Sequence, residues 1–172
     1  MAMIHLEPQT LEMFSRALDG LKPPPNLSLS QWADKYRKLC AEASASQGQW
    51  NTDAAPFQRE IMDAIGDVHV RKVVAMMCAQ AGKTEGLILN TIGFYMSYHP
   101  ASIMVMQPTV NLGESFSKDR LTPMLRDTPA LRGLVNTKSR YSGNTISKKN
   151  FPGGMLVIVG ANAPTDLRSR PI

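Results

Sequence analysis

The feature that most constrains this fold is a short turn, residues 77–84 with the sequence MCAQAGKT, between two apolar stretches. Residues 72–78 form an apolar run with the length of a buried strand, and residues 85–92 have the pattern of a helix. A strand, a turn that ends in Gly-Lys-Thr and then a helix is the layout of a phosphate-binding P-loop. The turn therefore predicts an α/β domain that binds a nucleoside triphosphate.

The residue types in this turn suit phosphate chemistry. A tight turn before a helix directs several backbone N–H groups at one point, and the helix N-terminus adds partial positive charge there. Gly82 lets the backbone approach a phosphate because it has no Cβ. Lys83 is expected to contact the β- and γ-phosphates as the catalytic lysine, and Thr84 to place its hydroxyl on Mg²⁺. The predicted nucleotide-binding turn is completed by Ala79, Gln80 and Ala81.

The motif is incomplete, which leaves an alternative. The full pattern has a glycine five residues before Gly82, where this chain has Met77. The alternative is an ordinary turn between a strand and a helix, in which Lys83 is merely solvated. The flanking strand and helix patterns favour the P-loop.

Composition limits the class of protein. With 172 residues, 43% of them hydrophobic, the chain suits one domain with a core, or part of a larger one. No apolar stretch reaches the roughly 18 residues of a membrane span, and the first residues lack the pattern of a secretory signal. Cys40 and Cys78 form neither a disulfide pattern nor a metal pair, which favours a reducing cytoplasm.

The net charge of +5 is unevenly distributed. Residues 1–130 carry 12 Lys/Arg and 13 Asp/Glu, whereas residues 131–172 carry 7 Lys/Arg and only one acidic residue, Asp166. A basic segment suits the phosphate backbone of nucleic acid. The alternatives are a solvated basic face and a surface that pairs with an acidic protein. The basic residues are Arg132, Lys138, Arg140, Lys148, Lys149, Arg168 and Arg170.

Helix and strand patterns alternate along the chain. Helices are predicted over residues 10–18, 31–38, 56–66, 83–98 and 111–121; Ser28 or Ser30 caps the second, and Pro123 breaks or kinks the last. Residues 41–55 are predicted to form a loop anchored by Trp50. Besides residues 72–78, strands are predicted over residues 101–107, 144–147 and 155–160, with a turn at residues 150–154. This alternation predicts a mainly parallel sheet flanked by helices.

The expected organisation is a helical and linker segment over residues 1–55 and a partial P-loop ATPase domain over residues 56–172. ATPase cores contain a further buried strand whose acidic end organises Mg²⁺. After Lys83, no run of four apolar residues is followed by Asp or Glu. The domain is therefore expected to be incomplete at its C-terminus and, by itself, to bind nucleotide weakly.

Several segments follow one another in an order that is fairly specific. They are residues 30–37 (SQWADKYR), 56–63 (PFQREIMD), 79–85 (AQAGKTE), 107–109 (QPT), 160–164 (GANAP) and 167–171 (LRSRP). Through them, nearly the whole chain resembles the N-terminal part of the large terminase subunit of lambda-type tailed bacteriophages. The resemblance implies an ATPase that drives viral DNA into preformed capsids. It also implies ATP and Mg²⁺ as cofactors.

The resemblance further implies partners and a location. The partners are double-stranded DNA, a small terminase subunit and the portal or capsid, with a homo-oligomer in the complete motor and no membrane. The location is the cytoplasm of the bacterial host. The family also carries a nuclease domain, which corresponds to no residue of this chain.

Four further residues or segments take roles from the resemblance. Gln58 corresponds to the glutamine that reads adenine, since an amide can both donate to and accept from one adenine edge; the alternative is a polar residue on an exposed helix face. Arg168 and Arg170 are candidate sensors of γ-phosphate charge, or else they hold the chain or contact DNA. Residues 107–109 match a strand-end motif near DNA, or simply terminate a strand.

Two other functions compete with the packaging motor. One is a helicase-like or restriction-type ATPase, which shares the order of glutamine and P-loop. The other is a prophage remnant without catalysis, which binds DNA or a partner.

Overall fold

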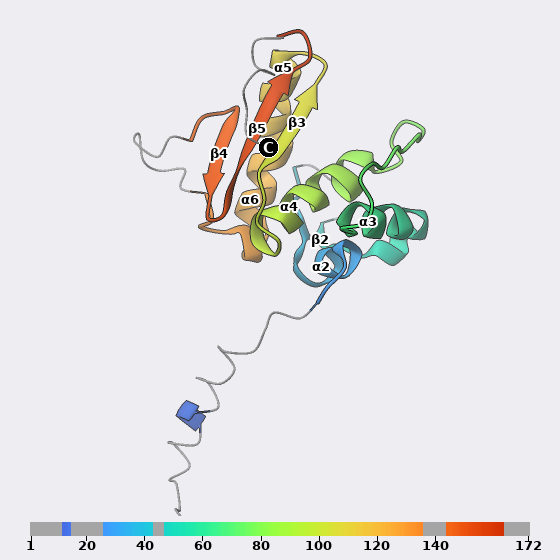
Figure 1. Ribbon diagram of the computed structural model, residues 1–172, viewed down its shortest axis with the longest axis vertical. Coiled ribbons are helices and arrows are strands. Elements are labelled where there is room, and N and C mark those ends of the chain that lie inside the picture. The colour runs from blue at the N-terminus through green and yellow to red at the C-terminus, as the bar shows by residue number, and fades with distance from the viewer. Residues whose placement is uncertain (1–11, 15–25, 43–46, 136–143, 164–172) are drawn as a thin grey trace, which may run out of the picture.

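The computed structural model describes residues 12–14, 26–42, 47–135 and 144–163, which form a mixed α/β arrangement (Figure 1). Its first half contains α2 (Leu29–Tyr36), β1 (Lys38–Leu39), β2 (Gly48–Gln49), η1 (Thr52–Ala54), η2 (Pro56–Gln58) and α3 (Arg59–Gly66). Its second half contains η3 (Lys83–Leu89), α4 (Asn90–Ser97), β3 (Ile103–Gln107), α5 (Val110–Phe116), η4 (Ser117–Leu121), α6 (Thr122–Asp127), η5 (Pro129–Leu131), β4 (Lys148–Phe151) and β5 (Gly154–Gly160).

The larger sheet has the strand order β3-β5-β4. β3 pairs with β5 in parallel, with Val105 opposite Ile158, and β4 pairs with β5 antiparallel, with Phe151 opposite Gly154. The described sheet is therefore mixed. Strands 101–107 and 155–160 are confirmed as β3 and β5, and α5 packs against both of them (Figure 1).

The predicted strand at residues 144–147 is wrong, because the strand is β4, which begins at Lys148. The turn between β4 and β5 is Pro152–Gly153, and Gly153 has a φ of 86° that a residue with a Cβ rarely adopts. A tight turn fixes the register of a hairpin. The partner of β5 is consequently the segment directly before this turn.

The predicted buried strand before the turn is also wrong. Residues 72–78, called here the pre-loop segment, form no strand. Val73, Val74 and Met76 are 37%, 79% and 99% exposed. A buried strand needs partners for its backbone N–H and C=O groups, and no described strand pairs with this segment. Its apolar pattern alone is therefore insufficient to form a strand.

The predicted helices are largely present. Ser28 begins α2 with a capping box, in which its side chain accepts from the N–H of Gln31 and the Gln31 side chain accepts from the N–H of Ser28. The helices at 56–66 and 83–98 occur as η2 with α3 and as η3 with α4. The helix at 10–18 lies outside the described residues except for residues 12–14, which are helical. Among the described residues, no helix has both the length and the apolar character needed to cross a membrane.

Of the two outcomes predicted at Pro123, the break is wrong, because helical structure continues from Val110 to Asp127, and the kink stays a prediction. Proline clashes with the carbonyl four residues earlier in a regular helix. Just before Pro123 the chain forms a π-helix, η4, and the N–H of Thr122 bonds to the carbonyl of Ser117. This wider turn accommodates the proline ring within the first turn of α6.

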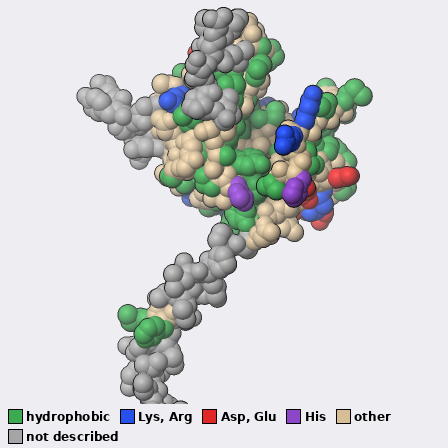
Figure 2. All heavy atoms as spheres, in the orientation of Figure 1, with side chains coloured by type: hydrophobic (Ala, Val, Ile, Leu, Met, Phe, Trp, Pro, Cys, Tyr) green, Lys and Arg blue, Asp and Glu red, His purple; other side chains and the backbone are tan. Residues whose placement is uncertain are grey.

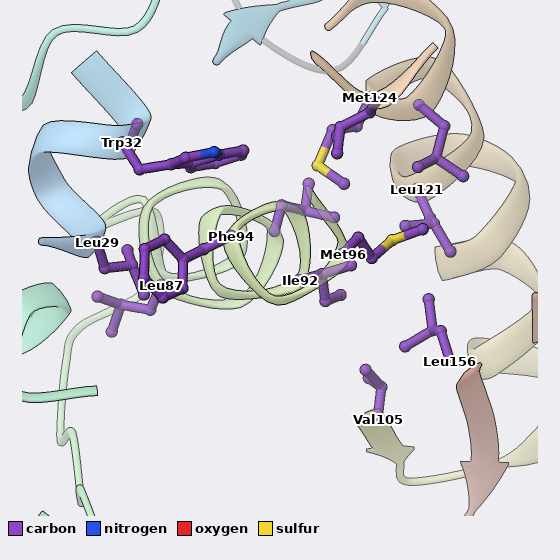
Figure 3. Close-up of a cluster of buried hydrophobic side chains, with 14 of the residues drawn as sticks. Leu29, Trp32, Leu87, Ile92, Phe94, Met96, Val105, Leu121, Met124 and Leu156 are labelled. Atoms are coloured by element: carbon purple, nitrogen blue, oxygen red, sulfur yellow. The ribbon is translucent and has the colours of Figure 1, made fainter. Parts of the chain in front are cut away.

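The core lies around the helix formed by η3 and α4. Figure 3 shows this helix between α2 on one side and α6 with the sheet on the other. Trp32 is 1% exposed and meets Phe94 edge-to-face, with 6.3 Å between ring centroids. Gly93 lets the Trp32 ring pack close to the backbone of α4, because a Cβ at Gly93 would lie 2.3 Å from Trp32 Cη2. The other labelled core residues are Leu29, Leu87, Ile92, Met96, Val105, Leu121, Met124 and Leu156.

The loop expected at residues 41–55 is present in its described part, residues 41–42 and 47–55. It also contains the short strand β2 and the short helix η1. β2 pairs with β1, and η1 follows Trp50. Trp50 is 8% exposed, and its indole N–H donates to Thr52 Oγ1 at 3.0 Å. The predicted division at residue 55 stays a prediction. Across it, α2 packs against α3 and α4.

Candidate nucleotide-binding site

The turn that precedes η3 has the backbone geometry of a helix start. Gly82 is the N-cap residue with a φ of 75°, and Gln80 also has a positive φ, of 58°. The carbonyl of Gly82 accepts from the N–H of Gly86 at 2.7 Å. Because the first N–H groups of a helix lack partners within it, the turn and the start of η3 together offer donors to an anion.

Gln58 packs directly against this turn. It is 2% exposed, and its Nε2 donates to the carbonyl of Ala81 at 2.7 Å, while its buried Oε1 has no partner. A Cβ at Gly86 would lie 1.9 Å from Gln58 Oε1, and one at Gly82 would lie 2.7 Å from Gln58 Nε2. The alternative that Gln58 lies on an exposed helix face is therefore wrong. Gln58 occupies the space that the two glycines leave.

Lys83 and Thr84 are the first two residues of η3. Lys83 is exposed, and its Nζ donates to the carbonyl of Met77 at 3.3 Å. This bond joins the residue after Gly82 to the residue at the start of the turn. Thr84 is half-buried beside it.

A pocket of about 480 Å³ adjoins the turn. Its walls include Trp50, Phe57 and Gln58 from the loop and η2, and Gln80 and Gly82 from the turn. Phe57 is 58% exposed, so an aromatic ring is available at its rim. Apolar walls with a few convergent polar groups are typical of small-molecule sites.

A buried ion pair that the sequence reasoning missed lies behind the turn. Arg37 Nη2 and Glu85 Oε2 are 2.7 Å apart, and the side chains are 1% and 14% exposed. Glu85 Oε1 lies 3.6 Å from Arg120 Nη1. Burial lowers the pKa of Arg37 and raises the pKa of Glu85, while the opposite partner charge acts against each shift. Charges 48 positions apart leave no periodic signal in a sequence, although both residues lie in segments already singled out.

The described part of the chain contains no group of three or more His, Cys, Asp or Glu side chains that could hold a metal ion. The hydroxyl of Thr84 thus stays the predicted Mg²⁺ ligand.

The other predicted site residues are only partly placed. Arg168 and Arg170 lie outside the described residues. Of the basic segment, Arg132 is exposed and Lys148 and Lys149 are half-buried on β4; burial lowers the pKa of Lys149. In the strand-end motif, the Thr109 side chain accepts from the N–H of Leu112 and caps α5.

The site described so far is a glycine-containing turn at the start of a helix, in a mixed α/β protein. The model of the family described as phage terminase large subunit gpA, ATPase domain, matches residues 44–172, so the chain belongs to that family. The chain is 32% identical over 151 residues to the large terminase subunit of Enterobacteria phage P21, covering 87% of this chain and 23% of the relative. It is 28% identical over 165 residues to that of Escherichia phage lambda, covering 94% and 25%.

The chain thus spans about a quarter of the length of the curated relatives that it matches. No solved structure matches it. The family confirms the resemblance inferred from the ordered segments, and it favours a terminase over a helicase-like or restriction-type ATPase.

Proposed function

We propose that this chain binds ATP and Mg²⁺ at residues 79–84 and forms the N-terminal part of the ATPase of a viral DNA-packaging motor. The observation that carries the proposal is Gly82 in a left-handed conformation at the start of a helix, with Lys83 and Thr84 directly after it. Family membership supports nucleotide use. The finer fold assignment, a P-loop NTPase, is part of the same proposal.

The residues present suit this ligand. The N–H groups of the turn and of the first turn of η3 would hold phosphate oxygens, Lys83 would neutralise their charge, and Thr84 would hold Mg²⁺ through its hydroxyl. Gln58 keeps its proposed role beside the base. Its Nε2 donates to the carbonyl of Ala81 and its unpartnered Oε1 is buried beside Gly86, so contact with adenine requires the amide to turn toward the pocket that Gln58 lines. When bound, ATP supplies the γ-phosphoryl group whose transfer to water releases the energy for movement.

The partners of the complete protein belong to the same proposal. It would move double-stranded DNA through contacts to the phosphate backbone, act with a small terminase subunit and the portal or capsid, and assemble as a homo-oligomer in the host cytoplasm. Basic residues of the C-terminal segment are the proposed DNA contacts, among them Arg132 and Lys148, with Arg168 and Arg170 as contacts to DNA or to the γ-phosphate. The cleavage of DNA is proposed for the complete protein and is assigned to no residue here.

Replacement of Lys83 tests the nucleotide site. Lys83→Ala should weaken binding of a fluorescent ATP analogue with Mg²⁺, because it removes a charge-assisted contact of about 1.5–3 kcal/mol, which is roughly 10- to 150-fold in Kd. Lys72→Ala is the matched control, since Lys72 is also exposed but precedes the turn. Circular dichroism should show unchanged folding for both variants. In the complete protein, Lys83→Ala should also abolish ATP turnover.

Equal affinity of the Lys83→Ala variant and the original chain would overturn the site. A chain that binds DNA in a salt-dependent manner but binds no nucleotide would instead support the prophage remnant.

A further inference from the structure

Arg37 is among the most deeply buried large side chains, although it carries a charge. It follows α2 as the C-cap residue, its Nη1 donates to the carbonyl of Lys38, and its Nη2 donates to Glu85 Oε2 at 2.7 Å. Its Nε has no partner. An arginine in this environment requires a structural reason, because the transfer of a charge from water into a protein interior is unfavourable.

Stability is a poor explanation for this ion pair. Burial lowers the pKa of Arg37 and raises the pKa of Glu85, so for both groups the loss of hydration outweighs the attraction of the partner. Pairs of this kind are often replaced by apolar residues without loss of stability. Their better-attested use is to select one geometry among several.

The geometry that this pair selects is that of the phosphate-binding turn. Glu85 is the third residue of η3, directly after Lys83 and Thr84, and its backbone belongs to the first turn of the helix that Gly82 begins. A bond of 2.7 Å between Arg37 and Glu85 joins the end of α2 to that helical turn. Arg120 of η4 lies 3.6 Å from the other carboxylate oxygen, so Glu85 faces cations from two separate elements.

The turn needs side-chain anchors because its N-terminal arm lacks strand pairing. Within the described residues, no strand pairs with the pre-loop segment. Gln58 holds the turn at the carbonyl of Ala81, and Lys83 bonds back to the carbonyl of Met77. The Arg37–Glu85 pair is the anchor that acts on the helical side of the turn.

We propose that Arg37 is a positioning residue that holds the phosphate-binding turn in place through Glu85. Arg37 contacts no nucleotide in this proposal, and its effect on ATP affinity passes entirely through the first turn of η3. The expected effect of Arg37 on ATP binding rests on the proposed function. Its expected effect on the position of the turn does not.

The test compares the variants Arg37→Met, Glu85→Gln and the double variant in this chain. Two quantities are measured: amide hydrogen exchange of residues 79–86 without nucleotide, and Kd for a fluorescent ATP analogue with Mg²⁺. Arg59→Met is the matched control, because Arg59 also pairs with a carboxylate at 2.7 Å, that of Asp53, but at the surface. Thermal unfolding monitors global stability in each variant.

Arg37→Met should accelerate exchange in residues 79–86 and weaken ATP affinity by about tenfold, while the control changes neither. The double variant should match the more strongly affected single variant, because two residues that act through one contact are not additive. Unchanged exchange and affinity in a folded Arg37→Met variant would overturn the proposal. So would additive effects in the double variant.

Arg37→Lys decides the question if Arg37→Met fails to fold. Lysine keeps the charge but loses the planar guanidinium that bonds the Lys38 carbonyl and Glu85 together. In the Arg37→Lys variant, faster amide exchange should be confined to residues 79–86. A uniform increase in exchange over the whole chain would assign Arg37 a purely structural role. If the original chain binds no nucleotide, the proposed function fails, and the exchange measurement alone still decides whether Arg37 positions the turn.

Discussion

Two apolar segments of similar composition differ in structure: one forms a buried strand, and the other forms no strand and is largely exposed. β5 lies at the centre of its sheet, and Leu156, Val157 and Val159 are 0%, 5% and 3% exposed. The pre-loop segment is equally apolar, but Val74 and Met76 are 79% and 99% exposed. Figure 2 shows hydrophobic side chains on the protruding loop that Figure 1 places between α3 and α4.

The difference lies in the partners that surround each segment. β5 pairs with β3 on one side and β4 on the other, and α5 packs against it. The pre-loop segment has no strand beside it among the described residues. An apolar run therefore becomes a buried strand only where neighbours satisfy its backbone groups and cover its side chains.

Hydrogen exchange gives the largest contrast between the two segments. Amides in the middle of β5 should open only with global unfolding, at about 5–15 kcal/mol for an ordinary domain. Amides of residues 72–78 should exchange at nearly the rate of an unfolded chain. Exchange followed by mass spectrometry of peptides from both segments measures this difference, and strong protection of the pre-loop segment would show that it pairs in solution.

A matched pair of substitutions gives the next largest effect. Val159→Asp places a carboxylate at a site that is 3% exposed and should destabilise the chain by about 4 kcal/mol or more. Val74→Asp places the same carboxylate at a site that is 79% exposed and should change stability by less than about 0.5 kcal/mol. Urea unfolding measures both. Comparable losses in the two variants would mean that Val74 is buried.

Local sequence patterns account for much of the fold. The sequence offers Ser28 or Ser30 as the cap of a helix at 31–38, and the structure selects Ser28, so that α2 begins two residues earlier than predicted. The helix at 83–98 is predicted because it is apolar on nearly all sides, and it lies in the core. Strand pairing of residues 72–78 is not encoded locally, since an apolar pattern carries no information on whether another strand lies beside it.

In the candidate site, too, some residues are recognised from the sequence, and other contacts are found only in the structure. Gly82, Lys83 and Thr84 are recognised from their spacing and occupy the start of η3. The placement of Gln58 inside the turn, and the ion pair of Arg37 with Glu85, depend on contacts between distant segments. Such contacts between isolated polar residues follow no periodicity, so sequence reasoning identifies the turn but not what supports it.

Gly86→Ala tests whether Gln58 fills the space beside the turn that follows the pre-loop segment. The added Cβ would lie 1.9 Å from Gln58 Oε1, so this variant should lose about 1–3 kcal/mol of stability. In a Gln58→Ala background the clash is removed, and the same change should become neutral or stabilise the helix by up to about 1 kcal/mol. Thermal or urea unfolding of the four proteins measures this reversal of sign. An equal effect in both backgrounds would mean that Gln58 does not fill this space.

The smallest expected effect on stability concerns Met76. Because this side chain is 99% exposed, Met76→Lys should change the free energy of unfolding by less than about 0.5 kcal/mol. It should nevertheless reduce self-association in sedimentation measurements, since an exposed apolar segment favours contacts between molecules. Met62→Lys is the control, because Met62 is 0% exposed on α3 and should not tolerate a charge. A large loss of stability in the Met76→Lys variant would remove the distinction between β5 and the pre-loop segment, because it would require that segment to be packed.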